Sequence, residues 1–589
     1  MKQILALALA GLLSVAAVSQ TNPRKSSPTK SSKPLSAPAR KALQNGFDAL
    51  QQRNFTAAQT ELEKAVRLAP NSPDAHNLLG FVLMVKGENA KAIQHLQQAV
   101  KLKPTYTVAY INLAQVQLAE RHLEAAESSA RRAVQLGIKS EEAHRILARV
   151  LSARKDNAGA VAALLMAVKL APNRADLFDE LGSAYSLNGD MTGAEQSFTK
   201  AIQLSPDYSP AHLHLGVVHL TRKDFVQAVT SLREAVRLAP DNPQSHYYLG
   251  IALESSGNRQ DARETFERSL QLDPNSANAH SQLGLLLQRT GETEEAIAHF
   301  KKAIELRPSD ADLYNNLGIA YVQAGKGPES IAAHREAVKL NPRDPAYVMN
   351  VGLAQMQSGD FDSAIASYRE ALKLDPNSAE IYYNLGVAYK LKDQLPQAIE
   401  ALQQAIRLNP KLPDPHYTLG VSLWQKGDFP EAAKHLRAAI EVNPEYVEAH
   451  YTLGTVLRQM NQLPEAAAEL REAIRLQPDF LGAHTNLATV LQALGDTAGA
   501  SAERKLVAEI SRKGTNLQGA TFSTNSGIRL LNAGDVDTAI AQFQQAIKLT
   551  PDYAPAYYQL GRALQRQGKA AEAEQAFAKA ASLDPRYRR

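Results

Sequence analysis

The stretch LDPNSAEIYYNLGVAYKL, residues 374–391, sets the pattern for the whole chain. Thirty-four residues earlier the sequence reads LNPRDPAYVMNVGLAQMQ, and 34 residues later it reads LNPKLPDPHYTLGVSLWQ. Proline marks this period, because it recurs at multiples of 34 residues from Pro70 to Pro478, and the spacing resumes at Pro551 and Pro585. A short internal period predicts a stacked array of repeats, not several closed domains, even in a chain of 589 residues.

The repeats are counted so that each ends two residues past its proline. Fourteen units then occupy residues 39–514, residues 515–519 form an insertion, and two further units occupy 520–589. The eighth place of a unit is Gly in thirteen of the sixteen, and the twentieth is Ala in fifteen. In the unit that starts at residue 379, Tyr382, Leu385, Gly386 and Tyr389 lie at i, i+3, i+4 and i+7 on one helical face. Small residues such as Gly386 and Ala398 let two antiparallel helices approach closely, so each unit is predicted to be a helical hairpin.

These residues resemble the tetratricopeptide repeat, a 34-residue helix-turn-helix motif, over about nine tenths of the chain. The resemblance implies an all-α fold, namely an α-solenoid that winds as a right-handed superhelix of about sixteen helix-turn-helix repeats. The array is also similar to the repeat superhelix of O-linked N-acetylglucosamine transferases, which carries a ladder of Asn residues. Here an interrupted ladder occupies the sixth place of six units: Asn112, Asn316, Asn350, Asn384, Asn486 and Asn525. A catalytic domain like that of those transferases is not expected here, because repeats run to residue 587.

The N-terminus indicates the compartment. Residues 1–19 combine Lys2 with an apolar stretch from Ile4 to Val18 and small residues before Gln20, which is typical of a secretory signal peptide. An uncleaved anchor is the alternative, although the apolar stretch is short for a membrane span. Residues 20–38 are rich in Pro, Ser and basic residues and are expected to be a disordered linker. We therefore expect an exported protein, periplasmic or associated with the cell envelope, without an integral membrane span after signal cleavage.

Charge and cysteine content limit the classes of function. Residues 1–41 hold seven of the 65 Lys and Arg residues and no acidic residue, which leaves 58 basic against 60 acidic residues in the repeats. Nucleic-acid binding is not expected, because it needs a concentrated basic surface. The chain has no Cys, which excludes disulfides, thiolate nucleophiles and zinc sites that contain Cys.

The period fails near residue 500. The unit that starts at residue 481 has Arg504, Val507 and Arg512 where an aromatic residue, Ala and Pro are usual. Residues 496–513 read as one lengthened helix that ends at Gly514, and residues 515–519 follow as an insertion. We expect a kink or hinge at 515–519, and the alternative is a loop insertion that preserves the stacking of repeats.

No motif predicts catalysis. Hydrolase motifs and phosphate-binding loops are missing from the sequence, and neither catalytic residues nor a cofactor are expected. No metal site is expected either. Eight of the fifteen His residues occupy the fourth place of a repeat, where they replace a packed aromatic residue: His76, His144, His212, His246, His280, His416, His450 and His484. Acidic residues such as Asp312, Glu380 and Asp414 lie in the first turn of first helices, where the helix dipole favours them.

The resemblance makes the concave wall, formed by the first helices, the expected ligand groove. Aromatic, amide and cationic side chains on this wall suit an extended peptide. The candidate residues are Asn316, Asn350, Tyr383, Asn384, Lys390, Tyr417, Trp424, Tyr451 and Arg458. The alternative for each of them is a solvated wall residue with local bonds between repeats.

The expected function is a non-catalytic scaffold that binds a protein or peptide partner in this groove, within an envelope assembly, secretion or polysaccharide-export complex. Two alternatives stay open at the level of sequence. One is the substrate-recruiting part of a glycosyltransferase-type system, and the other is a self-associating structural rod, hence a homo-oligomer.

Overall fold

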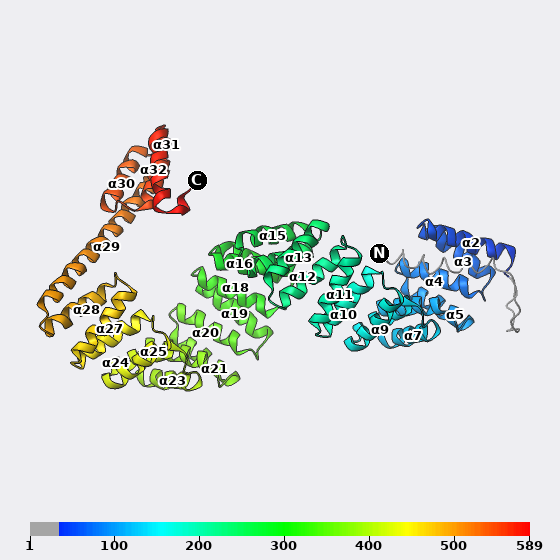
Figure 1. Ribbon diagram of the computed structural model, residues 1–589, viewed down its shortest axis with the longest axis horizontal. Coiled ribbons are helices and arrows are strands. Elements are labelled where there is room, and N and C mark those ends of the chain that lie inside the picture. The colour runs from blue at the N-terminus through cyan, green and yellow to red at the C-terminus, as the bar shows by residue number, and fades with distance from the viewer. Residues whose placement is uncertain (1–34, 589) are drawn as a thin grey trace. The chain divides into compact units, whose positions relative to one another are not determined.

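A computed structural model describes residues 35–588 as an array of helices (Figure 1). The predicted signal peptide and almost all of the predicted linker lie outside the described residues. Within residues 35–588 there is no β-strand, and the helices alternate with short turns in the order that the 34-residue period predicts. The predicted all-α solenoid of helix-turn-helix repeats is therefore confirmed. No helix in residues 35–588 is both long enough and apolar enough to cross a membrane.

The chain divides into two compact units at residues 307 and 308, and the first unit holds eight repeats. Its helices are α2 (Ala37–Gln51), α3 (Phe55–Leu68), α4 (Pro73–Val85), α5 (Asn89–Leu102), α6 (Thr107–Ala119), α7 (Leu123–Leu136), α8 (Glu141–Ala153), α9 (Asn157–Leu170), α10 (Ala175–Leu187), α11 (Met191–Leu204), α12 (Ser209–Thr221), α13 (Phe225–Leu238), α14 (Pro243–Ser255), α15 (Arg259–Leu272), α16 (Ala277–Thr290) and α17 (Thr293–Leu306).

The second unit holds the other eight repeats. Its helices are α18 (Ala311–Gln323), α19 (Gly327–Leu340), α20 (Pro345–Gln357), α21 (Phe361–Leu374), α22 (Ala379–Leu391), α23 (Leu395–Leu408), α24 (Pro413–Lys426), α25 (Phe429–Val442), α26 (Val447–Gln459), α27 (Leu463–Leu476), α28 (Leu481–Ala493), α29 (Thr497–Asn532), α30 (Val536–Leu549), α31 (Ala554–Arg566) and α32 (Ala570–Leu583), followed by the 3₁₀ turn η2 (Pro585–Tyr587).

The turn inside each repeat depends on a left-handed residue at the fifteenth place. Ten repeats have Gly there, for example Gly359 with φ 76°. The other six repeats place a non-glycine residue in the same conformation, for example Lys155 with φ 65°. An acidic residue often caps the helix that follows, as where the backbone N–H of Ser363 donates to Asp360 Oδ1 at 3.1 Å.

Close packing of the two helices explains the glycine at the eighth place. A Cβ added to Gly386 would lie 2.7 Å from Leu402 Cγ of the second helix, closer than atoms can pack. Phe198 and Phe266 fill the corresponding space opposite Gly182 and Gly250. Small residues at the eighth place therefore let large residues of the second helix be buried against the first helix.

Within each unit the first helices of adjacent repeats lie against one another. Contacts of this kind join α4 to α6 and α12 to α14 in the first unit, and α22 to α24 and α24 to α26 in the second. No pair of second helices makes a comparable contact in residues 35–588. The first helices are thus more closely spaced than the second helices, so they form the inner wall of each unit.

The structure corrects the end predicted for the lengthened helix. Helix α29 runs without interruption from Thr497 to Asn532, through Gly514 and residues 515–519 (Figure 1). It supplies the second helix of repeat 14 and the first helix of repeat 15, since it packs against α28, α30 and α31. The prediction that Gly514 ends the helix is wrong, because one Gly without a following Pro costs a helix only about 1 kcal/mol. The hinge at 515–519 stays a prediction.

Candidate functional site

The inner wall consists of the second, fifth, sixth, ninth, twelfth and thirteenth places of the first helices. Side chains 35 residues apart join neighbouring first helices along it. From the fifth place of one repeat to the sixth of the next, the bonded pairs are Asn77–Asn112, Arg145–Glu180, Asp179–His214 and Asn315–Asn350, at 2.6 to 3.0 Å. From the twelfth to the thirteenth place, they are Glu254–Arg289 at 2.5 Å and Trp424–Gln459 at 2.6 Å. Much of the polar wall is therefore engaged in bonds between repeats.

In repeats 4 and 5 the charged residues of the wall neutralise one another. Arg145, 9% exposed, donates three hydrogen bonds to Glu180, two from Nε and one from Nη2, and its guanidinium lies 3.3 Å from Asp176 and 3.6 Å from Glu142. Arg174 completes the cluster by pairing with Glu142 and Asp176, both at 2.6 Å. This cluster was not among the candidates predicted from sequence, although opposite charges 35 residues apart could have identified it.

Repeats 11 to 13 have a different wall, with Tyr383, Tyr417 and Tyr451 at the fifth place of α22, α24 and α26. All three tyrosines are partly buried. The ring of Tyr417 lies 5.0 Å from that of Tyr446, and the ring of Tyr451 lies 4.7 Å from that of Phe480, which limits their motion. Burial raises the pKa of Tyr383 and Tyr417, so both are neutral donors near pH 7. The structure thus brings these predicted residues into one aromatic row.

The twelfth place of the same three helices holds Lys390, Trp424 and Arg458. Burial lowers the pKa of Lys390, and among the described residues its ammonium group has no ion-pair partner. Arg458 is also partly buried, and its Nε has no hydrogen-bond acceptor in the described part of the chain. Trp424 lies between them in sequence order, held by its bond to Gln459. Two cations on this wall are therefore desolvated without the anionic partners that Arg145 has.

Five of the six asparagines of the ladder fall into two kinds, and the sixth, Asn525, is exposed. Asn112, Asn350 and Asn486 donate to Asn77, Asn315 and Thr455 of the preceding repeat, at 2.8 to 3.0 Å. For these residues the alternative interpretation, a local bond between repeats, describes the structure. Asn316 and Asn384 are partly buried and make no such bond within residues 35–588, so their amides can reach a ligand.

The eight histidines of the fourth place are within hydrogen-bonding distance of the turn between repeats. In each, Nε2 lies 2.9 to 3.3 Å from the backbone carbonyl oxygen of the residue six positions earlier, as in His76 with Pro70. Tyr557 at the same place donates its hydroxyl to the Pro551 carbonyl at 3.1 Å. In five repeats, Nδ1 of this histidine meets a His or Glu 19 residues later. No group of three or more potential metal ligands occurs in the described part of the chain.

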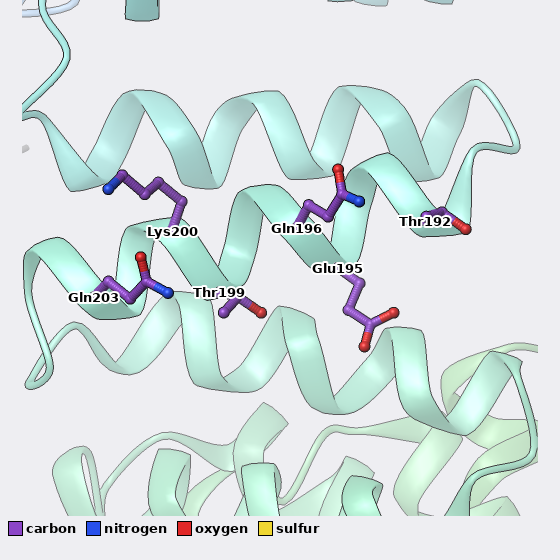
Figure 2. Close-up of a pocket in the computed structure, with 6 residues that line it drawn as sticks. All are labelled: Thr192, Glu195, Gln196, Thr199, Lys200 and Gln203. Carbon is purple, nitrogen blue, oxygen red and sulfur yellow. The ribbon is translucent and has the colours of Figure 1, made fainter.

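One surface depression lies along α11 and is lined by six polar residues of that helix alone: Thr192, Glu195, Gln196, Thr199, Lys200 and Gln203 (Figure 2). Arg222 pairs with Glu195 and donates to Thr192 at 2.9 Å. Because the depression is shallow and its residues come from one helix, it brings no converging set of reactive groups together.

Comparisons with known proteins agree with the repeat pattern. Models of the tetratricopeptide repeat match residues 43–107, 187–246, 242–309, 481–503, 529–568 and 554–587. A model of the C-terminal domain of cilia and flagella-associated protein 70 matches residues 289–488. No curated protein sequence matches the chain.

Solved structures share the helical architecture at low identity. The Cut9–Hcn1 hetero-tetramer of the APC/C is 16% identical with a TM-score of 0.38, and the match covers 77% of this chain and 96% of that one. Yeast Tom70 is 17% identical with a TM-score of 0.35, covering 79% of this chain and 96% of its own. MamA of Desulfovibrio magneticus RS-1 is 26% identical with a TM-score of 0.28, covering 28% and 95%.

Proposed function

Because this chain is a tetratricopeptide-repeat α-solenoid, we propose that it is a protein-interaction scaffold and that repeats 11 to 13 bind an extended peptide segment along their inner wall. The observation that carries the proposal is the pair of partly buried cations Lys390 and Arg458 beside the tyrosine row, neither of which has an anionic partner within residues 35–588. Removing a cation from water without a counter-charge is costly, and an anionic ligand offsets that cost.

The spacing of the cations defines the ligand. Adjacent first helices lie about 10 Å apart, so Lys390 and Arg458, two repeats apart, are separated by about 20 Å. An extended peptide covers this distance in about six residues. The ligand is therefore a segment with two acidic residues about six positions apart and an apolar residue between them, which packs against Trp424 and the tyrosines. The amide of Asn384 makes no bond between repeats in the described part of the chain and can bond the peptide backbone.

The only Trp of the chain, Trp424, reports directly on this wall. We expect its fluorescence to change saturably with an acetylated peptide that carries two Glu residues six positions apart around a central Leu. The same peptide with Lys in place of Glu should give no change. Lys390→Met should weaken binding of the Glu peptide about tenfold, the loss of one charge-assisted contact. The control variant is Lys434→Met. Lys434 lies on α25, a second helix away from the inner wall, and pairs with Glu431 of the same helix, so this change should leave binding of the Glu peptide unchanged. Equal binding of both peptides would refute the proposed role of the cations.

Aromatic contact area is tested separately. Calorimetry should detect no binding of the Glu peptide to the double variant Tyr417→Ala and Trp424→Ala, while the unfolding temperature of the array stays that of the parent. Unaltered affinity in this variant would move the binding surface to another part of the array.

We place this role in the cell envelope because residues 1–19 are typical of a secretory signal peptide. The scaffold would then serve an envelope assembly, secretion or polysaccharide-export complex. In a Gram-negative host, osmotic shock should release the protein when it is expressed with residues 1–19 and should not release it when expression starts at Gln20. Retention of both proteins inside the cell would contradict this location.

A further inference from the structure

The third place of the first helix is the residue on which one repeat stacks against the previous one. Ala75, for example, packs with Ala65 of the preceding second helix, and Ala556 packs with Ala546. This residue is buried in fourteen of the sixteen repeats: Ala75, Ala109, Ala143, Leu177, Ala211, Ser245, Ala279, Leu313, Tyr347, Ile381, Pro415, Ala449, Ala483 and Ala556. A preceding second helix is therefore what normally covers the third place.

The two exceptions differ in chemistry. Lys41 holds the third place of the first repeat, which has no preceding repeat in this sequence, and a charged residue suits the exposed position. Phe522 holds the third place of repeat 15 and is 74% exposed, although a large apolar side chain at this place is suited to burial. The third place of repeat 15 thus has a side chain suited to packing against a preceding second helix, but no such helix covers it in this conformation.

The missing neighbour is the second helix of repeat 14, which here belongs to the same continuous helix. Its residue at the twenty-seventh place, Val507, is the one that should cover Phe522. The twenty-seventh place is fully buried in every other repeat, but Val507 is partly exposed. Fifteen residues of straight helix hold Val507 and Phe522 about 22 Å apart. Helix α29 therefore separates the two halves of one standard interface between repeats.

We propose that a second copy of this chain fills both halves, in a twofold dimer in which two α29 helices cross antiparallel about Gly514 and Thr515. Antiparallel pairing about this point places Val507 of each copy opposite Phe522 of the other copy. It reproduces the contact between the second helix of one repeat and the first helix of the next, with repeats 15 and 16 exchanged between copies. Such an exchange closes on itself, since each copy gives and receives the same segment.

The surface of α29 fits this pairing. Val507, Ile510, Gly514 and Leu517 follow one another at spacings of three and four residues, which places them on one face of the helix. A Cβ added to Gly514 would meet nothing within 4 Å, so a second helix can approach there closely. At 100° per residue, Lys505 and Arg512 lie on the opposite face, and Lys513 is paired with Glu509 at 3.0 Å. Lys505 and Arg512 therefore lie away from the apolar stripe, while Arg504 and Lys513 flank it and are bonded to Gln492 and Glu509 of the same chain.

Sedimentation of the full-length protein tests the dimer. We expect twice the 64.0 kDa mass of one chain, and a monomer for Phe522→Asp, with self-association weakened tenfold or more. Val226→Asp changes an equally exposed apolar residue, 73% exposed on α13, and should stay dimeric. A dimer that persists in Phe522→Asp overturns the proposal. Because Phe522 is exposed within one chain, the variant should keep the helical content of the parent.

Disulfide trapping distinguishes exchange between copies from closure within one chain. The chain has no Cys, so single-Cys variants Val507→Cys and Phe522→Cys, with different tags, can be mixed, unfolded together and refolded before oxidation. The proposal requires a bond between the two tagged chains at high yield. A double variant that forms its disulfide within a monomer, with no bond between chains in the mixture, shows that α29 bends back on itself and overturns the proposal.

Discussion

His450 Nδ1 lies 2.6 Å from the carboxylate of Glu469, while its Nε2 lies 3.0 Å from the carbonyl oxygen of Pro444. Both neighbours are acceptors, so the ring satisfies them together only as the doubly protonated imidazolium. The pKa of His450 is accordingly raised, chiefly by the hydrogen bond to Glu469. Three other repeats have a second His in place of the Glu: His95, His299 and His435, each with its pKa lowered by burial. The two arrangements respond to acid in opposite directions.

Replacing His435 by Glu should reverse the response of its repeat to acid. Burial lowers the pKa of both His416 and His435 below 6.5, so the stability from this pair is complete above pH 6.5 and is lost as the pH falls through their folded pKa values. In His435→Glu, His416 gains the arrangement of His450. Its contribution is then complete below pH 6.5 and is lost as the pH rises through the raised pKa. The unfolding temperature should therefore fall less between about pH 7.5 and about pH 5 in the variant. Gln403→Glu, which adds one negative charge on an exposed residue of α23, should behave as the parent; a similar change in both variants would rule out the pairing as the cause.

His334, a single buried histidine, should also make the stability of the array depend on pH. It fills the space under Gly318, where repeats 7 and 8 have Phe266 and Phe300, and burial lowers its pKa to about 4. The folded state resists protonation, so stability is lost as the pH falls from 6.5 to about 4, by about 3 kcal/mol in full. His334→Phe removes this loss but also the bond from His334 Nδ1 to Asn315 Oδ1 at 3.1 Å, at a cost of about 1 kcal/mol near neutral pH. Urea unfolding at several pH values should give curves of stability that cross, and parallel curves would contradict the assignment.

Gly386 and Leu402 should behave as one packing unit. Gly386→Ala brings a Cβ within 2.7 Å of Leu402 Cγ and should cost about 1 to 3 kcal/mol of unfolding free energy. Leu402→Ala alone leaves a cavity and should cost about 2 to 5 kcal/mol. The double variant should lose clearly less unfolding free energy than the sum of the two single variants. Repeat 3 already has Ala at both places, with Ala114 and Ala130 buried, so an Ala pair fits this space. Simple additivity in a double-mutant cycle would show that the two positions do not compete for space.

The period of the sequence was sufficient to predict the hairpins, because each repeat restates the same small residues, caps and turns. Gly386 and Asp360 have the packing and capping roles that their places imply. The joining of two repeats into α29 was not predictable from these rules. A helix continues through Gly514 when no proline and no packing partner forces a turn, and that depends on tertiary contacts that local sequence does not report.

The candidate site was predicted only as a surface. The tyrosine row follows from the fifth place alone, but which polar residues are free does not. Asn350 is occupied by Asn315 and Arg145 by Glu180, whereas Lys390 lacks an ion-pair partner among the described residues. These differences depend on pairs 35 residues apart in neighbouring helices. The hydrogen bonds of the fourth-place histidines to backbone carbonyl oxygens six residues earlier were also not predicted, because the sequence pattern does not report contacts between a side chain and the backbone.

Lys155→Gly should stabilise the fourth repeat. Lys155 has φ 65°, a left-handed conformation that costs a residue with a side chain about 1 to 2 kcal/mol and that Gly adopts freely. The added freedom of Gly in the unfolded chain removes part of this gain, so we expect a net increase of about 0.5 to 1 kcal/mol in unfolding free energy. The reverse change in a repeat that has Gly at this place, Gly359→Lys, should destabilise by a similar amount. A loss of stability in Lys155→Gly would mean that the Lys side chain contributes a contact larger than the strain.

Binding of the Glu peptide at the inner wall should be coupled to proton uptake at alkaline pH. Burial lowers the pKa of Lys390 in the free protein, and a carboxylate placed against the ammonium group favours its charged form and raises the pKa again. At alkaline pH, where a fraction of the free Lys390 is neutral, binding takes up protons. Calorimetry in two buffers of different ionisation enthalpy measures the number of protons taken up per peptide bound. Lys390→Arg keeps the charge but cannot lose its proton in this range, so it should bind the peptide without uptake. Proton uptake that is unchanged in Lys390→Arg would show that another group titrates on binding and that Lys390 does not face the ligand.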